Sequence, residues 1–245
     1  MSAISNNEIK KIRSLGDKKF RDKLGLFVVE GEKMVDELLH SSFEVEAVYY
    51  RQDIGDEAMK RISFLSTPSP VLAVAKKPQT IFLSDDPFSK DGRGLFLALD
   101  AIRDPGNLGT IMRVADWFGI DAIFASRDTV DLFNPKVVQS TMGSIFRVPF
   151  YYTDIPQICS FAREHGGSVY GTFLDGENIY EKNLNKGKDS PSVIITGNES
   201  NGISAAVAAK VSDRLFIPPF NPHRGHPESL NAAIATAVTI SEFRR

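Results

Sequence analysis

An amide and a guanidinium stand six residues apart in DAIRDPGNLGTIMRVADWFGI, residues Asp100–Ile120, which follows the apolar run LFLAL. The helical period places four apolar residues on one face of the predicted helix: Ile111, Val114, Ala115 and Phe118. Arg113 lies off that face, so Asn107 and Arg113 are candidates for binding a polar ligand just beyond a strand. Two structural alternatives stay open, because Asn107 can cap the helix and Arg113 can pair with Asp116.

Two further turns that follow strands are unusually polar. TGNESNGIS (Thr196–Ser204) holds Glu199 between two glycines, and IPPFNPHRGHPESLN (Ile217–Asn231) delivers Ser229 and Asn231 to the start of the last helix. Ligands of parallel sheets bind outside the carboxyl ends of the strands, so the three turns predict one shared site. Taken singly, Glu199 can complement a helix dipole and Ser229 can be a helix cap.

These turns favour a ligand that bears no phosphate. GNESNG lacks the lysine and the spacing of a P-loop, and no G-x-G-x-x-G sequence follows a strand. Glycine-rich backbone and apolar residues without a cluster of cations suit an adenosine-containing molecule. The pair His223 and His226, with Glu228 nearby on a proline-rich loop, is too weak a pattern to predict a metal site.

The elements that must position these residues alternate between strands and helices. LFLALDAI, DAIFAS, GSVYGTFL, SVIITG and RLFIPP read as strands, and helices are expected from Leu108, near Pro135–Ser140 and over SLNAAIATAVTISEF. Runs buried on both faces and separated by helices predict an α/β fold with a mostly parallel sheet and helices on both faces. In the last helix, Leu230, Ile234, Ala237 and Ile240 or Ser241 are expected to face the sheet.

A second, smaller α/β domain is expected over residues 1–84. GLFVVEG, EVEAVYY and PVLAVAKK read as its strands, and EKMVDELLHS and DEAMKRIS as helices. Residues 85–94 are rich in Asp, Pro, Ser and Gly and form the predicted linker, which leaves 95–245 as the larger domain.

The composition is that of a globular protein of 245 residues, with 42% hydrophobic and 24% charged residues. The single cysteine, Cys159, cannot form an internal disulfide and is interpreted as a core residue. A polar amino terminus and the absence of an apolar run of spanning length predict a cytoplasmic protein without a membrane partner.

The formal net charge of −2 gives no general attraction to nucleic acid, but residues 10–23 hold seven basic and two acidic residues. Such a strip can attract a phosphate backbone, and Lys18, Lys19 and Arg21 are its candidate RNA contacts. The alternative is a solvated charged face.

Three segments, in order, closely resemble the motifs of the SpoU/TrmH family of RNA 2'-O-methyltransferases, part of the SPOUT superfamily: DPGNLGTIMRVADWFG, VIITGNESNGIS and IPPF…ESLNAAIATAV. KVVQSTMGSIFRVPF (Lys136–Phe150) looks like the family's segment between the first two motifs. KKFRDKLGLFVVEGEKMVDELL looks like the small substrate-binding domain that precedes the catalytic domain in many ribosomal RNA members. Together the resemblances cover nearly the whole chain.

The resemblance implies a trefoil knot in the C-terminal part, S-adenosylmethionine as cofactor and a homodimer. Matching motif positions carry over five residues as catalytic or target-binding: Asn107, Arg113, Glu199, Ser229 and Asn231. Further positions correspond to cofactor contacts: Thr172, Leu174, Gly197, Asn198, Gly202, Ile217, Pro218, Ser229 and Leu230. Two departures from the family pattern are the lengthened link FNPHRGHP and Pro219 in place of the usual Met.

The expected function is therefore methyl transfer to a ribose 2'-hydroxyl of RNA, with ribosomal RNA favoured over transfer RNA. By resemblance Arg113 receives the hydroxyl proton; because arginine normally stays charged, a phosphate clamp is the alternative role. Asn107 and Asn231 would position the ribose or neighbouring side chains, and Glu199 would hold Arg113. The competing interpretations are a non-catalytic RNA-binding or assembly factor and a small-molecule enzyme with an adenosine cofactor.

Alanines around much of the last helix also favour a homodimer.

Overall fold

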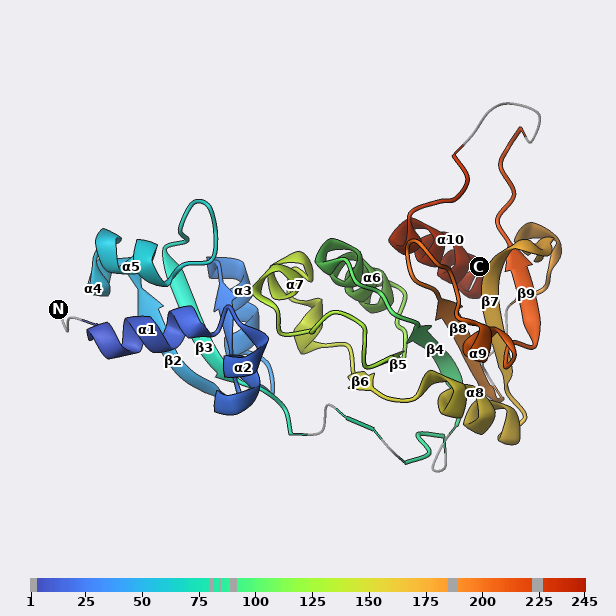
Figure 1. The fold of residues 1–245 in the computed structure, drawn as a ribbon, viewed down its shortest axis with the longest axis horizontal. Coiled ribbons are helices and arrows are strands. Elements are labelled where there is room, and N and C mark those ends of the chain that lie inside the picture. Colours follow the sequence, from blue (N-terminus) through green and yellow to red (C-terminus); the bar gives the residue numbers. More distant parts are fainter. Residues whose placement is uncertain (1–3, 80–81, 84, 89–91, 185–188, 222–226) are drawn as a thin grey trace. The chain divides into compact units, whose positions relative to one another are not determined.

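The computed structural model describes residues 4–79, 82–83, 85–88, 92–184, 189–221 and 227–245. The chain divides into two compact units (Figure 1). The first unit comprises Met1–Gln79 and Asp131–Arg147, and the second comprises Thr80–Val130 and Val148–Arg245. The boundary at Gln79 lies close to the predicted one at residue 84. The sequence predicted that all of 95–245 forms one domain, whereas Asp131–Arg147 belongs to the first unit.

The first unit is built around a three-stranded antiparallel sheet in the order β1-β3-β2. Its strands are β1 (Leu26–Glu30), β2 (Val45–Tyr50) and β3 (Val71–Lys76), and its helices are α1 (Asn6–Ser14), α2 (Lys18–Leu24), α3 (Glu32–Leu39), α4 (Arg51–Ile54), α5 (Asp56–Ile62) and α7 (Pro135–Ser140), with the short η1 (Ser144–Phe146). The side chain of Ser5 and that of Glu8 form a capping box at the start of α1, which fixes where this helix begins.

Residues 131–147 belong to the first unit because their side chains complete its core. The ring of Phe133 lies 4.7 Å from that of Phe27 in β1, and Phe146 packs edge-on against Phe43. Nη2 of Arg21 lies 2.7 Å from the Asp131 carboxylate. These contacts join residues more than a hundred positions apart, which local sequence patterns do not reveal.

The second unit contains a six-stranded parallel sheet in the order β6-β5-β4-β8-β7-β9, as the alternation of buried strands and helices predicted. Its strands are β4 (Gly94–Leu99), β5 (Ala122–Ala125), β6 (Phe150–Tyr152), β7 (Ser168–Asn178), β8 (Pro191–Thr196) and β9 (Asp213–Phe216). Its helices are α6 (Pro105–Trp117), α8 (Ile155–Glu164), α9 (Ala205–Ala208) and α10 (Ala232–Arg244), with the short η2 (Ile179–Glu181).

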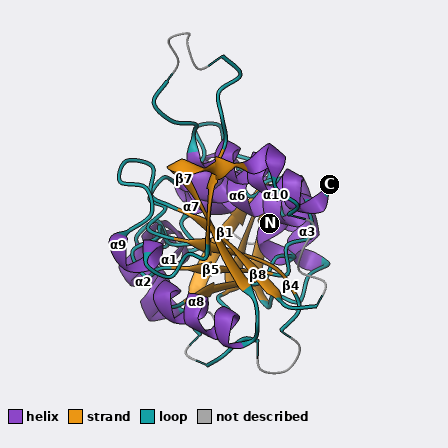
Figure 2. Ribbon diagram, turned by 90° about the vertical axis from the view of Figure 1, so that its right-hand side faces the viewer, coloured by secondary structure: helices purple, strands orange, loops and turns teal. Residues whose placement is uncertain are grey.

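Helices cover both faces of this sheet (Figures 1 and 2). Alternate residues of β4 and β8, among them Phe96 and Val193, form one core with Ile158 of α8. On the opposite face α10 contacts α6 and β8, and Thr236 of α10 shares a hydrogen bond of 2.8 Å with Thr196. None of the helices in the described part of the chain has the length and apolarity needed to cross a membrane.

Both helices that carry candidate site residues begin at positions other than those predicted. Asp104 caps α6 and accepts from the backbone N–H of Asn107 at 2.8 Å, so Asn107 is not the cap. Asn231, rather than Ser229, caps α10. A polar residue followed by proline at the first helical position, here Asp104 with Pro105, is the sequence signal for the start of α6.

The predicted inward face of α10 is also wrong in part. The buried residues are Ala233, Thr236, Thr239, Ile240 and Phe243, whereas Leu230 and Ile234 are each 51% exposed. This helix carries small residues on all sides, so its hydrophobic periodicity is too weak to identify the buried face.

Candidate active site

Three polar segments of the second unit follow strands of the parallel sheet, and their side chains meet. β4 leads into α6, β8 leads into the turn that holds Glu199, and β4 and β8 pair directly along their whole length. The third segment follows β9 and ends at Asn231, the cap of α10. The arrangement is the one expected for a ligand site of a parallel sheet.

A chain of side-chain hydrogen bonds joins the three segments. Nδ2 of Asn231 donates to Oδ1 of Asn107 at 2.8 Å, and Nδ2 of Asn107 donates to Oε1 of Glu199 at 3.0 Å. Oδ1 of Asn231 in turn accepts from the backbone N–H groups of Ala233 and Ile234. Both hydrogen-bonding ends of Asn107 are thereby used, which sets the orientation of its amide.

Glu199 accepts further hydrogen bonds from the backbone N–H groups of Asp104 at 3.2 Å and Arg103 at 3.4 Å. Burial acts to raise the pKa of Glu199, but the bonds from Asn107 and from these backbone groups outweigh it, and the net effect lowers the pKa. The carboxylate is therefore ionised near neutral pH and serves as the acceptor at the end of the chain of hydrogen bonds.

The turn after β8 is held closed by its own backbone. Asn198 and Gly202 form an antiparallel bridge with two hydrogen bonds of 2.9 Å, and Nδ2 of Asn198 donates to the carbonyl of Ala101 at 2.7 Å. A Cβ atom on Gly197 would lie 2.4 Å from the carbonyl carbon of Gly202, so only glycine fits at 197. Asn198 and Gly202, expected as cofactor contacts, thus shape the turn.

Ala101, which the sequence reading missed, has an unusual backbone conformation at the end of β4. Its φ of 60° lies in the left-handed region, which is sterically unfavourable for residues other than glycine. The backbone is held from two sides, because its N–H donates to Oγ of Ser126 at 2.8 Å and its carbonyl accepts from Asn198. Strain held in this way is typical of functional sites.

Arg113 and Ser229 lie outside the chain of hydrogen bonds. Both are exposed, and within the described residues Arg113 forms no ion pair, either with Asp116 or with Glu199. The expected contact from Glu199 to Arg113 is replaced by the contact to Asn107. The guanidinium of Arg113 is therefore open to an anion from outside the chain.

Other expected cofactor contacts lie on β7, which pairs with β8, and just after β9, which pairs with β7. Thr172 pairs with Leu215 where β7 meets β9, and Ile217 and Pro218, both half-buried, follow β9 directly. Leu174 is 71% exposed, which leaves an apolar side chain open to a ligand. Part of the lengthened link, residues 222–226, lies outside the described residues.

Arg21 is not available to RNA, contrary to the prediction. The residue is 1% exposed, its Nε donates to Asp131 at 2.9 Å, and its Nη1 donates to the carbonyl of Leu15 at 2.7 Å. Lys18 is exposed and paired with Asp22 at 2.6 Å, and Lys19 is also exposed. The basic strip therefore contains a buried structural arginine beside solvated lysines.

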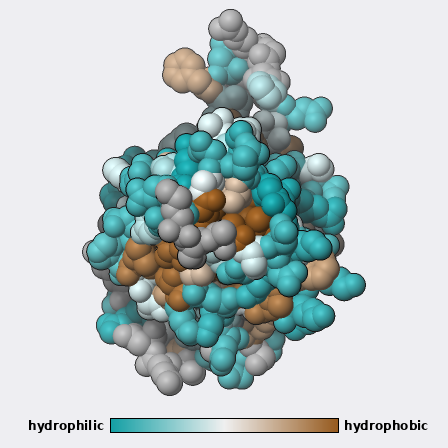
Figure 3. Space-filling model, turned by 90° about the vertical axis from the view of Figure 1, so that its left-hand side faces the viewer, coloured by the Kyte–Doolittle hydropathy of each residue, from teal (hydrophilic) through white to brown (hydrophobic). Residues whose placement is uncertain are grey.

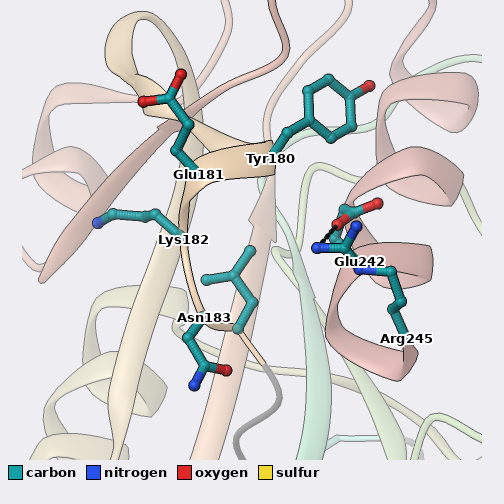
Figure 4. A pocket seen from close by; sticks show the side chains of 7 residues that line it. Tyr180, Glu181, Lys182, Asn183, Glu242 and Arg245 are labelled. Atoms are coloured by element: carbon teal, nitrogen blue, oxygen red, sulfur yellow. Dashed lines mark ion pairs between the residues drawn. The ribbon is translucent and has the colours of Figure 1, made fainter.

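Features elsewhere in the second unit are separate from this site. A pocket of about 340 Å³ is lined by Tyr180, Lys182, Glu242 and neighbouring residues (Figure 4). It lies at the far end of α10 from Asn231, and both of its cations are already paired, Lys182 with Asp213 at 3.0 Å and Arg245 with Glu242 at 3.1 Å. Cys159 is fully buried in the core beside α8, which confirms its predicted structural role.

Metal ligation is not indicated for the residues that the structure describes, among which no group of three His, Cys, Asp or Glu side chains could hold an ion. His223 and His226 lie outside those residues.

The geometry can be compared with known proteins. Residues 94–241 match the profile of the SpoU rRNA Methylase family, and residues 6–80 match the MRM3-like substrate binding domain. The chain is 29% identical to the 23S rRNA (guanosine(2553)-2'-O)-methyltransferase RlmP of Bacillus subtilis, over 100% of the chain and 98% of that protein. Several solved structures cover nearly the whole chain, including the following two. One, a TrmH-family protein from Porphyromonas gingivalis, is 37% identical with a TM-score of 0.85 over 99% of each chain. The other, an AdoMet-bound rRNA methyltransferase from Sinorhizobium meliloti, is 28% identical with a TM-score of 0.86, over 100% of this chain and 96% of that one.

Proposed function

Because the chain belongs to the SpoU rRNA Methylase family, we propose that it transfers a methyl group from S-adenosylmethionine to a ribose 2'-hydroxyl of RNA, with ribosomal RNA as the favoured substrate. The observation that carries the proposal is the hydrogen-bonded chain from Asn231 through Asn107 to Glu199, which unites the three motif segments. The relatives named as rRNA methyltransferases support the choice of RNA.

The described residues fit S-adenosylmethionine. The close approach at Gly197 gives a cradle of bare backbone beside β8, and Leu174 and Leu230 offer exposed apolar surface. With Thr172, Asn198, Gly202, Ile217, Pro218 and Ser229, these residues are the proposed cofactor contacts. When bound, the cofactor would supply a methyl group on a sulfonium; transfer to the 2'-oxygen would leave a neutral thioether and release the hydroxyl proton to solvent. The cofactor bears no phosphate, which agrees with a site built without a cluster of cations.

The side chains of the site would orient the acceptor ribose. Glu199, held ionised by its hydrogen bonds, fixes the amide of Asn107, and Asn231 fixes it from the other side. Holding the hydroxyl in line for displacement is a large part of the catalytic task. Arg113 is exposed and stays charged in proteins, so its proposed role is to clamp a phosphate of the target rather than to accept the proton. Ser229, exposed just before α10, is the fifth proposed residue of the site.

The two units divide the work in this proposal. The first unit, Met1–Gln79 with Asp131–Arg147, binds RNA, and the second unit, Thr80–Val130 with Val148–Arg245, transfers the methyl group. The match of residues 6–80 to a substrate-binding domain supports this division.

The proposed place of action is the cytoplasm, and a single buried cysteine is compatible with a reducing compartment. Family membership also supports a trefoil knot in the C-terminal part.

A homodimer formed through the second unit is part of the proposal. Trp117 of α6 is 86% exposed and Ile234 of α10 is 51% exposed, and these two helices contact each other. Large apolar side chains on neighbouring helices favour association. If Arg113 of one subunit helps hold RNA bound to the other, activity falls on dilution below the dimer's dissociation constant. Sedimentation that finds a fully active monomer near 27.1 kDa would contradict the dimer.

Two measurements test the function against its alternatives. Isothermal titration with S-adenosylmethionine separates a methyltransferase from a cofactor-free RNA-binding factor. Transfer of radiolabelled methyl groups to purified ribosomal RNA, with transfer RNA and small hydroxylated molecules as competing acceptors, separates it from a small-molecule enzyme. We expect cofactor binding and label in ribosomal RNA. Label in transfer RNA alone would show that the substrate is transfer RNA and not ribosomal RNA. A chain that does not bind S-adenosylmethionine would refute the proposed methyltransferase activity.

A further inference from the structure

A groove of about 720 Å³ in the first unit lies outside the candidate active site. It is lined by residues of α1 and α5 and by the segment that follows α5. Four cationic side chains line it: Lys10, Arg13, Lys60 and Arg61. The structure describes all of its lining residues, and none of them is acidic. The groove therefore has the size of a ligand site and the charge to attract an anion.

A flat surface is presented in this groove by the exposed Arg13 guanidinium, with the Phe64 ring beneath it. The Arg13 guanidinium lies over the Phe64 ring, 4.9 Å from its centroid, and its Nη1 donates to the carbonyl of Ser63 at 2.6 Å. Arg13 is exposed, and Phe64 is half-buried against the core of the unit. Aromatic rings and guanidinium planes are the groups on which proteins stack unpaired bases.

The Phe64 side of this surface is fixed before any ligand binds. The buried Glu30 carboxylate accepts from the Phe64 backbone N–H at 2.6 Å and from Oγ of Ser63 at 2.7 Å. On the other side, a Cβ atom on Gly16 would lie 2.7 Å from Cε1 of Phe64, so the absence of a side chain there makes room for the ring. A ring that is already held loses little freedom on binding.

The remaining cations, Lys10, Lys60 and Arg61, are exposed and can reach phosphates. Lys60 pairs with Glu57 at 3.0 Å in an exposed bridge, and Nη2 of Arg61 donates to Oδ1 of Asn6 at 3.1 Å. Exposed pairs of this kind are weak, so a phosphate can displace them. Figure 3 shows one face of the first unit, where apolar side chains lie among hydrophilic ones. A mixture of apolar, aromatic and basic groups suits a nucleotide better than an acidic peptide, which would leave the flat surface unused.

We propose that this groove binds unpaired nucleotides of the RNA substrate, with a base stacked on the outer face of the Arg13 guanidinium, which the Phe64 ring supports from beneath, and phosphates held by Lys10, Lys60 and Arg61. The inference rests on the proposed RNA methylation and deepens it. It also shifts the principal RNA contact of the first unit from Lys18 and Lys19 to this groove.

The test measures the affinity of the full-length chain for a short fluorescein-labelled oligouridylate, by anisotropy over a series of salt concentrations. Phe64→Leu keeps an apolar side chain against the core but removes the ring, and we expect Kd to rise about fivefold or more. The double variant Lys10→Ala/Arg61→Ala should lower the slope of log affinity against log salt by about 0.7 for each lost phosphate contact. The matched control Lys33→Ala/Lys76→Ala removes the same charge from exposed positions of the same unit outside the groove and should keep the wild-type slope.

Arg13→Ala provides a second test of stacking on an exposed residue, in case Phe64→Leu unfolds the unit, and circular dichroism checks each variant. The proposal is overturned if the wild type does not bind the oligouridylate, if polyglutamate displaces it at equal charge concentration, or if the control flattens the slope and the groove variant does not. Failure of the proposed function is a separate result. A chain that binds the oligouridylate through the groove but methylates no RNA refutes the function and leaves the groove. Groove variants that methylate ribosomal RNA with wild-type kcat and KM refute the groove alone.

Discussion

The side-chain amide of Asn231 donates to the side-chain oxygen of Asn107 at 2.8 Å, across 124 residues of sequence. The oxygen of the same Asn231 side chain accepts from the first backbone N–H groups of α10. One residue therefore both starts the last helix and connects it to the start of α6. Its two functions, stability and orientation, can be separated by substitution.

Asn231→Asp keeps an oxygen that can cap α10 but cannot donate to Asn107. We expect the free energy of unfolding to stay within about 0.5 kcal/mol of wild type, since Asp and Asn cap equally well, while methyl transfer falls sharply. Asn231→Ala removes the cap as well and should lower the free energy of unfolding by about 1 kcal/mol. Chemical denaturation and a methyl-transfer assay measure the two effects. Full activity of the Asp variant would show that the bond to Asn107 is not needed.

Ala101→Gly should stabilise the protein. The left-handed φ of 60° costs an alanine about 1–2 kcal/mol, and glycine adopts this conformation freely. We expect the free energy of unfolding to rise by about 0.5–1 kcal/mol, after the greater flexibility of glycine in the unfolded chain is subtracted. The control Ala237→Gly, within α10, should instead lower it by about 0.5–1 kcal/mol. A loss of stability in both variants would contradict the strain at Ala101.

Glu199 should stabilise the fold in a pH-dependent way. Its pKa is lowered in the folded state, so its contribution is present above the ordinary glutamate pKa of about 4.3 and is lost as the pH falls through the lowered value. The difference in unfolding free energy between wild type and Glu199→Gln should therefore shrink in acid. Denaturation curves at neutral and acid pH measure it. A difference that grows as the pH falls would have the wrong sign.

Cys159 should be unreactive in the folded protein. Burial raises the pKa of the thiol to about 12, and only the thiolate reacts readily. With a chromogenic disulfide reagent near the ordinary cysteine pKa of about 8.5, we expect almost no colour from the native chain and one thiol per chain after denaturation. Rapid reaction of the native chain would mean that the core around α8 opens readily.

The sequence was most informative where local pattern and final environment agree. β4 and β8 are buried on both faces, and their apolar runs predicted parallel strands whose ends carry Asn107 and Glu199. The order of the motifs along the chain also placed the third segment correctly at the start of α10. The hydrogen bonds between the segments could not be derived, because they depend on side-chain orientation across distant turns.

Arg21 shows why other predictions failed. Its neighbours in the sequence are basic and exposed, so the local pattern indicates a solvated face. Its partner Asp131 lies 110 residues away, in a segment expected to belong to the other domain. Burial of a charge by so distant a partner leaves no local signal. The buried face of α10 was missed for the opposite reason, since its small residues would suit burial on any side.

Arg113→Ala should abolish methyl transfer while cofactor affinity changes by no more than a few-fold. The side chain is exposed on α6 and forms no ion pair with any residue that the structure describes, so its loss should leave the fold intact. Titration calorimetry and a methyl-transfer assay give the two values. Full turnover by this variant would remove Arg113 from the proposed site.

The most direct measurement of the central claim is a map of ribose 2'-O-methylation across the total RNA of cells that carry the wild-type chain, the Arg113→Ala chain or no copy. Methylation of the 2'-hydroxyl protects the adjacent phosphodiester from alkaline cleavage, so each methylated nucleotide is read as a protected position. The account predicts one or a few protected positions in ribosomal RNA that appear with the wild-type chain and are absent from the other two samples. Identical maps from all three would contradict it.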